Sequence, residues 1–318
     1  MIEINNLVKK YGEHVAVDRL SLKLENGRIY GLLGANGAGK SSTMNIVTGY
    51  LGATSGEIKV DGFDIMSKPK KAKEHIGYLP EIPPLYLEMT VREYMDFVAG
   101  LKKLDKKLKE KYILDAMEET GLLDVSDRLI KNLSKGYRQR GGLAQAILGN
   151  PDNVILDEPM VGLDPKQIIE IRDLIKKLGE NHTVLLSSHI LTEISAVCDH
   201  VFIISKGKLV ASDTTENLLN QMSGVREIKL QVKIPLGKDK NIVTECLSDI
   251  ENIEQIDEED NENDEIYSYT IKADCKKDIR EQIFKKMVEN SISILELHTV
   301  EKSLEDVFLE LTQEGEER

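Results

Sequence analysis

The sequence predicts an α/β fold. A core of alternating strands and helices carries an antiparallel β subdomain and a helical subdomain, and a small α+β domain follows. Short apolar runs typical of buried strands alternate with helical patterns from residue 28 to residue 205. Segments of alternating polarity before residue 62 indicate antiparallel strands. The charge balance changes near residue 220, which predicts a boundary between a domain at 1–220 and a domain at 221–318.

The chain starts with the strands of the β subdomain. Residues 2–4 and 15–24 alternate between apolar and polar side chains, and Asn26-Gly27 predicts a tight turn into the next strand. Residues 56–62 read as another short strand that is closed by Asp61-Gly62. Together these segments predict an antiparallel layer beside the core.

A phosphate-binding loop is predicted directly after an apolar strand at residues 28–33. The motif G-x-x-x-x-G-K-[ST] is filled by Gly34, Ala35, Asn36, Gly37, Ala38, Gly39, Lys40 and Ser41, and Ser42 continues into a helix. In such a loop the backbone N–H groups and the helix N-terminus surround the phosphates. Lys40 is expected to reach the β- and γ-phosphates, and Ser41 is expected to bind Mg²⁺. The core is therefore predicted to be that of a P-loop NTPase.

The helical subdomain is predicted at about residues 82–150. Pro83 and Pro84 make the start of this segment a stiff, non-helical loop. Thr90 and Glu93 have the spacing of a capping box, and helical patterns continue from there to about residue 121. A further helix is predicted at residues 142–148.

Two buried-type strands later in the chain carry polar side chains at their carboxyl ends. Asp157 and Glu158 end the first strand, and His189 ends the second. Between the two strands, Asp164 predicts the N-cap of a helix at residues 165–178. A carboxylate at a strand end would face the phosphate loop, so Asp157 is predicted to hold Mg²⁺, directly or through water.

The order of these motifs resembles that of the nucleotide-binding subunit of ABC transporters. The most specific part is Leu133-Ser134-Lys135-Gly136-Tyr137, which stands shortly before the strand that ends in Asp157-Glu158. The resemblance covers about residues 1–220. In chain order the motifs are Tyr11, the phosphate loop, Glu81, residues 133–137, Asp157-Glu158, Gly162-Leu163-Asp164 and His189. The variants at residues 79–81 and 134–137 are most similar to single-cassette exporter subunits, whose permease is a separate chain.

The resemblance implies how the site hydrolyses ATP. Glu158 would polarise the attacking water, and His189 would contact the γ-phosphate that Lys40 also reaches. Tyr11 would stack on the adenine. The expected ligands of Mg²⁺ are Ser41, Asp157 and Glu81.

Some positions depart from the family pattern. Glu81 stands where the family commonly has Gln, and an ionised carboxylate accepts a metal but donates no hydrogen bond. In the usual Leu-Ser-Gly-Gly-Gln motif, Lys135 replaces a glycine and Tyr137 replaces the glutamine. The motif keeps Ser134 and Gly136, which in the family bind the γ-phosphate on the phosphate loop of the other subunit. The resemblance therefore implies a head-to-tail homodimer that encloses two ATP molecules.

The C-terminal domain differs in composition. Residues 221–318 hold 13 Lys and Arg against 25 Asp and Glu, so they carry nearly all of the net charge of −13. An acidic surface repels phosphates, which argues against nucleic acid as a partner. Strands are predicted at 227–234, 266–272 and 292–297, helices at 241–250, 278–290 and 304–311, and an acidic loop at 258–265. This part shows no catalytic constellation, and the three cysteines of the chain form no C-x-x-C pair.

The leading hypothesis is an ATP-hydrolysing subunit of an ABC exporter. ATP binding would close the dimer, a separate integral-membrane permease would switch its access, and hydrolysis would reset the dimer. The sequence has no apolar run near the ~18 residues of a spanning helix and no signal peptide, so the chain is expected on the cytoplasmic face of the membrane, held by the permease. The alternative is a soluble ABC ATPase that acts on ribosomes or DNA without a permease. A single phosphate loop, the lack of sustained heptads and the acidic C-terminal part favour the exporter.

Overall fold

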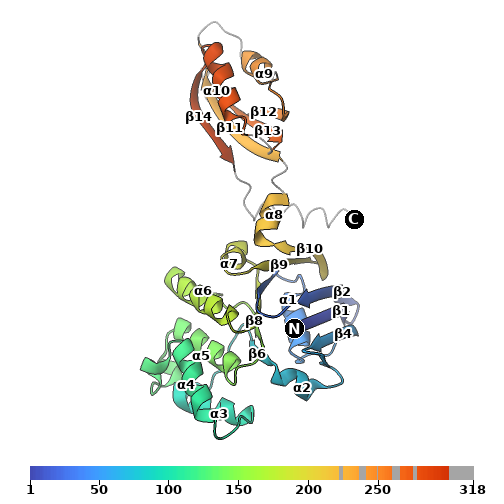
Figure 1. Cartoon of the computed structure of the whole chain (residues 1–318), viewed down its shortest axis with the longest axis vertical. Helices are drawn as coiled ribbons and strands as arrows, with labels where there is room; N and C mark the ends of the chain where they lie inside the picture. Colours follow the sequence, from blue (N-terminus) through green and yellow to red (C-terminus); the bar gives the residue numbers. More distant parts are fainter. Residues whose placement is uncertain (222–224, 236–240, 249, 260–265, 275–277, 301–318) are drawn as a thin grey trace. The chain divides into compact units, whose positions relative to one another are not determined.

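The computed structural model describes residues 1–318 except 222–224, 236–240, 249, 260–265, 275–277 and 301–318 (Figure 1). It divides into two compact units, one formed by Met1–Thr215 and the other within Glu216–Glu310. Within the described residues, no helix combines the length and the apolar character that crossing a membrane requires.

The centre of the first unit is a six-stranded sheet of order β10-β9-β3-β8-β7-β6. Its strands are β3 (Ile29–Leu33), β6 (Ile76–Leu79), β7 (Asn153–Leu156), β8 (Thr183–Ser188), β9 (His200–Ser205) and β10 (Lys208–Thr214). The first five run parallel, and β10 pairs antiparallel with β9. Every residue of β3, β7 and β8 is buried. Strands that are buried along their whole length are typical of parallel sheets covered on both faces, so the α/β prediction is confirmed.

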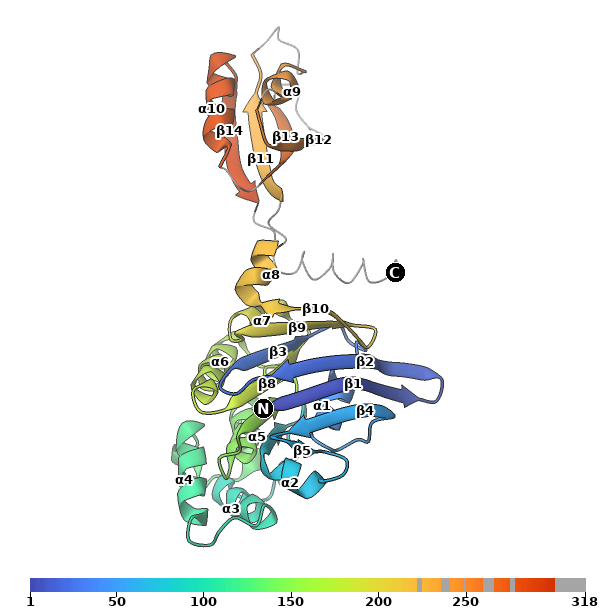
Figure 2. The same ribbon diagram turned by 45° about the vertical axis from the view of Figure 1, so that its right-hand side comes forward.

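The β subdomain is a four-stranded antiparallel sheet of order β2-β1-β4-β5 (Figure 2). Its strands are β1 (Ile2–Tyr11), β2 (His14–Leu24), β4 (Ser55–Val60) and β5 (Phe63–Asp64), and helix α2 (Pro69–Glu74) follows them. The inward side chains share one core with helix α1 (Lys40–Val47) and with Tyr30 and Leu32 of β3. This shared core places the β subdomain against the strand that leads into the phosphate loop.

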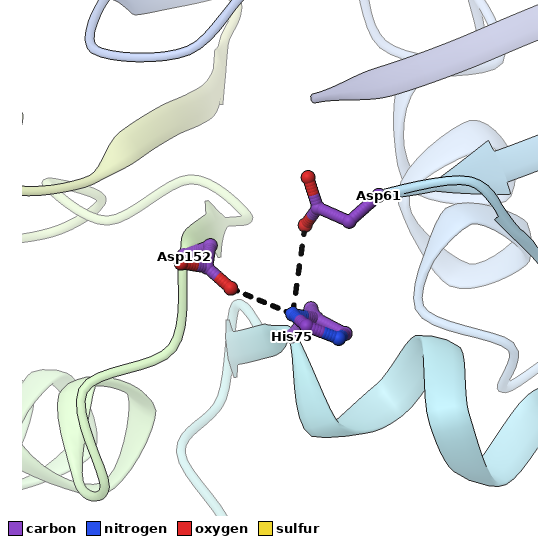
Figure 3. Close-up of side chains that lie close together, drawn as sticks. All are labelled: Asp61, His75 and Asp152. Carbon is purple, nitrogen blue, oxygen red and sulfur yellow. Dashed lines mark hydrogen bonds and ion pairs between the residues drawn. The ribbon is translucent and has the colours of Figure 1, made fainter.

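A polar cluster joins the β subdomain to the amino ends of β6 and β7 (Figure 3). The Nδ1 atom of His75 lies 2.6 Å from Asp152 Oδ2 and 3.8 Å from Asp61 Oδ2. The buried side-chain amide of Asn153 donates to Asp61 Oδ2 at 2.7 Å. His75 and Asp152 directly precede β6 and β7, and Asn153 is the first residue of β7. The cluster therefore lies at the end of the sheet opposite the phosphate loop, which follows β3. It therefore connects two parts of the fold away from the candidate site.

The helical subdomain contains α3 (Val91–Leu101), α4 (Lys109–Glu119), two short 3₁₀ helices (Leu123–Val125 and Ile130–Asn132) and α5 (Lys135–Ile147). The capping box is confirmed, because Glu93 N donates to Thr90 Oγ1 at 3.2 Å and Thr90 N donates to Glu93 Oε2 at 2.8 Å. The prediction of helical structure up to residue 121 was wrong in one respect. The helix breaks after α3, where Lys103 takes a positive φ of 56°.

The predicted start of the next helix at residue 142 was also wrong, because α5 begins at Lys135. The two glycines Gly141 and Gly142 suggest a break but lie inside the helix. A Cβ atom at Gly142 would stand 2.5 Å from a methyl carbon of Leu79 and 2.9 Å from Pro83. Glycine is therefore needed there for α5 to pack closely on β6 and on the proline-containing loop.

Two further helices complete the first unit: α6 (Pro165–Gly179) and α7 (Leu191–Ser195). Helix α8 (Thr215–Gln221) begins at the last residue of that unit, and its other residues belong to the second unit. The side chain of Asp164 accepts a hydrogen bond from Gln167 N at 2.9 Å, which confirms it as the N-cap of α6. Helix α6 packs against β8, and α7 packs against β3 and β8.

The second unit has the order β11 (Val225–Lys233), α9 (Asn241–Ser248), β12 (Ile253–Glu259), β13 (Ile266–Asp274), α10 (Arg280–Glu289) and β14 (Ser293–Val300). The strands form an antiparallel sheet of order β12-β13-β11-β14, which is the βαββαβ arrangement of ferredoxin-like domains. The α+β class is as predicted. Strand β12 was missed, and it ends with Glu258 and Glu259, which had been assigned to an acidic loop; the rest of that loop and the helix at 304–311 lie outside the described residues.

Candidate active site

Three adjacent strands of the core sheet end at the candidate site. Strand β8 lies between β3 and β7, and all three run parallel. Their carboxyl ends therefore meet at one edge of the sheet, where ligands bind in α/β folds. The phosphate loop follows β3, Asp157 and Glu158 follow β7, and His189 follows β8. The structure thus brings these sequence-predicted groups together.

The phosphate loop turns directly into helix α1. Gly37 and Gly39 have φ angles of 83° and 103°, a backbone region that suits glycine. Gly39 is the N-cap residue of α1, and no side chain caps this helix. The unpaired N–H groups of the first turn and the positive end of the helix dipole are thus available to an anion.

Lys40 turns back over its own loop. Its Nζ atom donates to the carbonyl oxygens of Gly34 at 2.8 Å and Ala35 at 3.3 Å. The same atom lies 3.4 Å from Glu158 Oε1, and both residues are buried. The phosphate-loop lysine and the carboxylate after β7 therefore face the same space.

Ser187 connects both carboxylate residues to β8, and sequence reasoning did not identify it. Its hydroxyl donates to Asp157 Oδ1 at 2.6 Å and accepts the backbone N–H of Glu158 at 2.9 Å. Glu158 itself has a positive φ of 48°. The signal in the sequence was the Ser187-Ser188 pair directly before His189, where apolar residues would be ordinary for a buried strand end.

Burial raises the pKa of Asp157, and the neighbouring carboxylates of Glu158 and Glu81 add to this effect. Hydrogen bonds from the hydroxyls of Ser187 and Ser41 act in the opposite direction, but burial has the largest influence. A buried carboxylate next to a hydroxyl suits a hard divalent cation, which takes oxygen ligands. Ser41, Asp157 and Glu81 are therefore a chemically reasonable set for Mg²⁺.

His189 reaches the carboxylate of Glu158 from the end of β8. Its Nδ1 atom lies 3.0 Å from Glu158 Oε2. The imidazole is 37% exposed, whereas the Glu158 side chain is 9% exposed. His189 thus lies at the rim of the site, and one of its ring nitrogens contacts the buried carboxylate of Glu158.

A cavity of about 390 Å³ opens over these groups. Its lining residues are Tyr11, His14, Ala16, Asn36, Gly37, Gly39, Lys40, Ser41, Ser42, Glu81, Glu158, Val161 and His189. The Tyr11 hydroxyl lies 3.5 Å from Ser42 Oγ, and its ring lies at the rim with Lys9 Nζ 5.0 Å from the ring centroid. Gly34, Ala35, Ala38 and Asp157 were also predicted to bind the cofactors but do not line this cavity.

Ser134 and Gly136 do not line the cavity either. They lie at the start of α5, where the Ser134 side chain accepts a hydrogen bond from Tyr137 N at 3.4 Å. Gly136 packs closely on Gln167 of α6, and Lys135 Nζ lies next to Gly162. These two predicted phosphate contacts are therefore separate from the phosphate loop of their own chain.

A parallel sheet with a phosphate loop, paired carboxylates and a histidine at its carboxyl edge defines a P-loop ATPase. The family model described as ABC transporter matches residues 17–161. The chain is 33% identical to the bacitracin transport ATP-binding protein BcrA of Bacillus licheniformis, over 99% of this chain and 98% of the relative. It is 30% identical to the linearmycin resistance ATP-binding protein LnrL of Bacillus subtilis (strain 168), over 98% of each.

Among solved structures, one described as the ATP-binding subunit of an ABC transporter superposes with a TM-score of 0.63 at 27% identity, covering 70% of this chain and 93% of the other. The chain therefore belongs to the ATP-binding subunits of ABC transporters, and it is an ATPase of that family. The predicted family, fold class and enzyme class are confirmed.

Proposed function

We propose that this ATPase works as a dimer of two cassettes that binds Mg²⁺-ATP and drives a separate integral-membrane permease. The observation that carries the proposal is the arrangement of Lys40, Glu158 and His189 around one cavity that excludes Ser134 and Gly136. Each cassette thus supplies one part of an ATP site and needs the other part from a partner.

Within one cassette, Lys40 and the N–H groups of the phosphate loop bind the phosphates. Ser41 and Asp157 hold Mg²⁺, with Glu81 as a further ligand. Glu158 takes the proton of the attacking water, since its buried carboxylate is held between Lys40 and His189. Tyr11 at the rim of the cavity stacks on the adenine.

Between cassettes, the start of α5 contacts the γ-phosphate of the second chain. Ser134 and Gly136 lie at a helix N-terminus, which attracts an anion. Two-fold symmetry makes the contact reciprocal, so two ATP molecules join two chains. Loss of the γ-phosphate then removes the shared ligand and releases the dimer.

The segment after β6 is the proposed contact with the permease. Ile82 is 82% exposed and Tyr86 is 53% exposed. The same loop packs on the glycines of α5 through Pro83 and Leu85. A permease helix seated on this loop would therefore sense movement of α5, and it would hold the cassette on the cytoplasmic face of the membrane.

The relatives support outward transport. Two relatives that match over 98% of their own length are named for bacitracin transport and for linearmycin resistance. Transport that confers resistance moves a compound away from its target, so we propose an exporter whose permease selects the cargo.

The deciding experiment is an affinity pull-down of tagged Glu158→Gln from detergent-solubilised native membranes with ATP and Mg²⁺. The substitution should keep the dimer closed and its attachments intact. A stoichiometric multi-spanning protein is the expected result. Recovery of the dimer alone, or of ribosomal or DNA-bound proteins, would favour a soluble ABC ATPase instead. Glu180→Gln, an exposed position on the same unit, is the matched control.

A further inference from the structure

The turn between β8 and α7 is held by a buried hydroxyl–carboxylate pair. Ser188 Oγ donates to Glu193 Oε2 at 2.7 Å and accepts the backbone N–H of Ile190 at 3.0 Å. Ser188 is fully buried and Glu193 is 6% exposed. A carboxylate is rarely buried to this extent without a defined partner, so the pair is a specific feature of the turn.

The arrangement is an extended form of a capping box. Ile190 is the N-cap residue of α7, and Glu193 is the third residue of the helix. In an ordinary capping box the third residue accepts the N-cap N–H directly. Here the Ser188 hydroxyl stands between the Ile190 N–H and the Glu193 carboxylate. The side chain of Glu193 is thus linked to the residue before His189 as well as to the residue after it.

His189 is the residue between these two anchored positions. Its imidazole is 37% exposed, so packing holds the ring less than it holds the fully buried side chain of Ser188. Its Nδ1 atom nevertheless lies 3.0 Å from Glu158 Oε2. The direction of the ring therefore depends on the backbone of the turn.

We propose that Glu193 is a positioning residue for hydrolysis, which acts through Ser188 to hold His189 against Glu158. The inference rests on the proposed roles of His189 and Glu158 and adds a residue to them. Glu193 does not line the cavity. It fixes the place from which His189 reaches the γ-phosphate, and loss of alignment by about 1 Å can reduce a rate by roughly 100-fold.

The first test compares steady-state ATPase kinetics of Glu193→Ala, Glu193→Gln and Ser188→Ala. Glu193→Ala and Ser188→Ala should lower kcat at least ~10-fold and leave KM within about twofold, because the phosphate loop is untouched. Glu193→Gln should keep at least about half of kcat, since its amide oxygen can accept the Ser188 hydroxyl. Thr192→Ala, an exposed change on the same helix, is the matched control. Equal loss in the Gln and Ala variants would overturn the proposal.

The second test repeats Glu193→Ala in a His189→Ala background. If Glu193 acts through His189, its effect should vanish there, and additive losses would show that it acts independently. Full turnover of His189→Ala alone would instead refute the proposed role of His189, so the two failures are distinguishable. Ser188→Ala removes a single oxygen atom and keeps the test valid even where Glu193→Ala unfolds.

Discussion

Lys40 Nζ and Glu158 Oε1 lie 3.4 Å apart, and their side chains are 6% and 9% exposed. The lysine comes from the phosphate loop after β3, and the glutamate comes from the end of β7, with β8 between the two strands. A buried ion pair contributes little net stability, but removing one partner leaves the other charge uncompensated. The two groups that we propose to serve the nucleotide therefore also compensate each other's buried charge.

Lys40→Ala should weaken ATP binding about 100-fold or more, because the charge-assisted contacts to the phosphates are lost. Isothermal titration with ATP and Mg²⁺ measures the dissociation constant. Lys23→Ala is the control, since Lys23 is exposed and only approaches Glu25 at 3.9 Å. An unchanged dissociation constant for Lys40→Ala would contradict the assignment of the loop.

Glu158→Gln should bind ATP within about threefold of the wild type and lower kcat ~100-fold or more. Gln has nearly the same shape and still accepts hydrogen bonds, but it does not take a proton from water. ATP-dependent dimerisation by size-exclusion chromatography and phosphate release measure the two effects. Normal turnover with intact binding would show that another group is the base.

Asp157→Asn should stabilise the protein in the absence of nucleotide and Mg²⁺, raising Tm by about 2 °C. Burial raises the pKa of Asp157 above that of the unfolded chain, so the folded protein binds more protons between the two pKa values. The contribution of this carboxylate to stability therefore falls as pH rises through that range. Calorimetry of both proteins from pH 4 to pH 8 should show the Tm difference growing with pH. If the wild type were more stable than the variant at pH 8, the raised pKa of Asp157 would be contradicted. The variant should lose Mg²⁺-dependent ATPase activity with either stability result.

The sequence predicted the site residues that belong to a motif of fixed spacing or whose residue type is unusual at their position. A phosphate loop has a fixed spacing, and Asp157-Glu158 and His189 stand out as polar groups at the ends of apolar strands. Ser187 and Glu193 were missed because a strand serine and a helix glutamate are ordinary in sequence. Their roles depend on which strand lies beside β7 and on the burial of α7, and both are properties of the assembled sheet.

The helix boundaries also show that the sequence predicted local interactions and missed contacts between distant residues. Thr90 and Glu93 act within four residues of each other, so their capping box could be predicted locally. The start of α5 could not, because Gly141 and Gly142 suggest a break. Gly142 in fact lets α5 approach Leu79 and the proline-containing loop, and this contact is remote in sequence.

Ser134→Ala should abolish ATP-dependent dimerisation while ATP binding to the single cassette stays within about threefold of the wild type. The reason is that Ser134 caps α5 away from the cavity lined by its own phosphate loop. The expected loss of stability is small, since the capping hydrogen bond to Tyr137 N is long at 3.4 Å.

Thr90→Ala is the matched control, because Thr90 also caps a helix of this subdomain and does so in a complete capping box. It should cost about 1 kcal/mol of stability and leave dimerisation intact. Analytical ultracentrifugation of both variants in the Glu158→Gln background, together with urea unfolding, separates the two effects. If both variants lost dimerisation in proportion to their loss of stability, Ser134 would be a structural cap and the shared ATP site would need another residue.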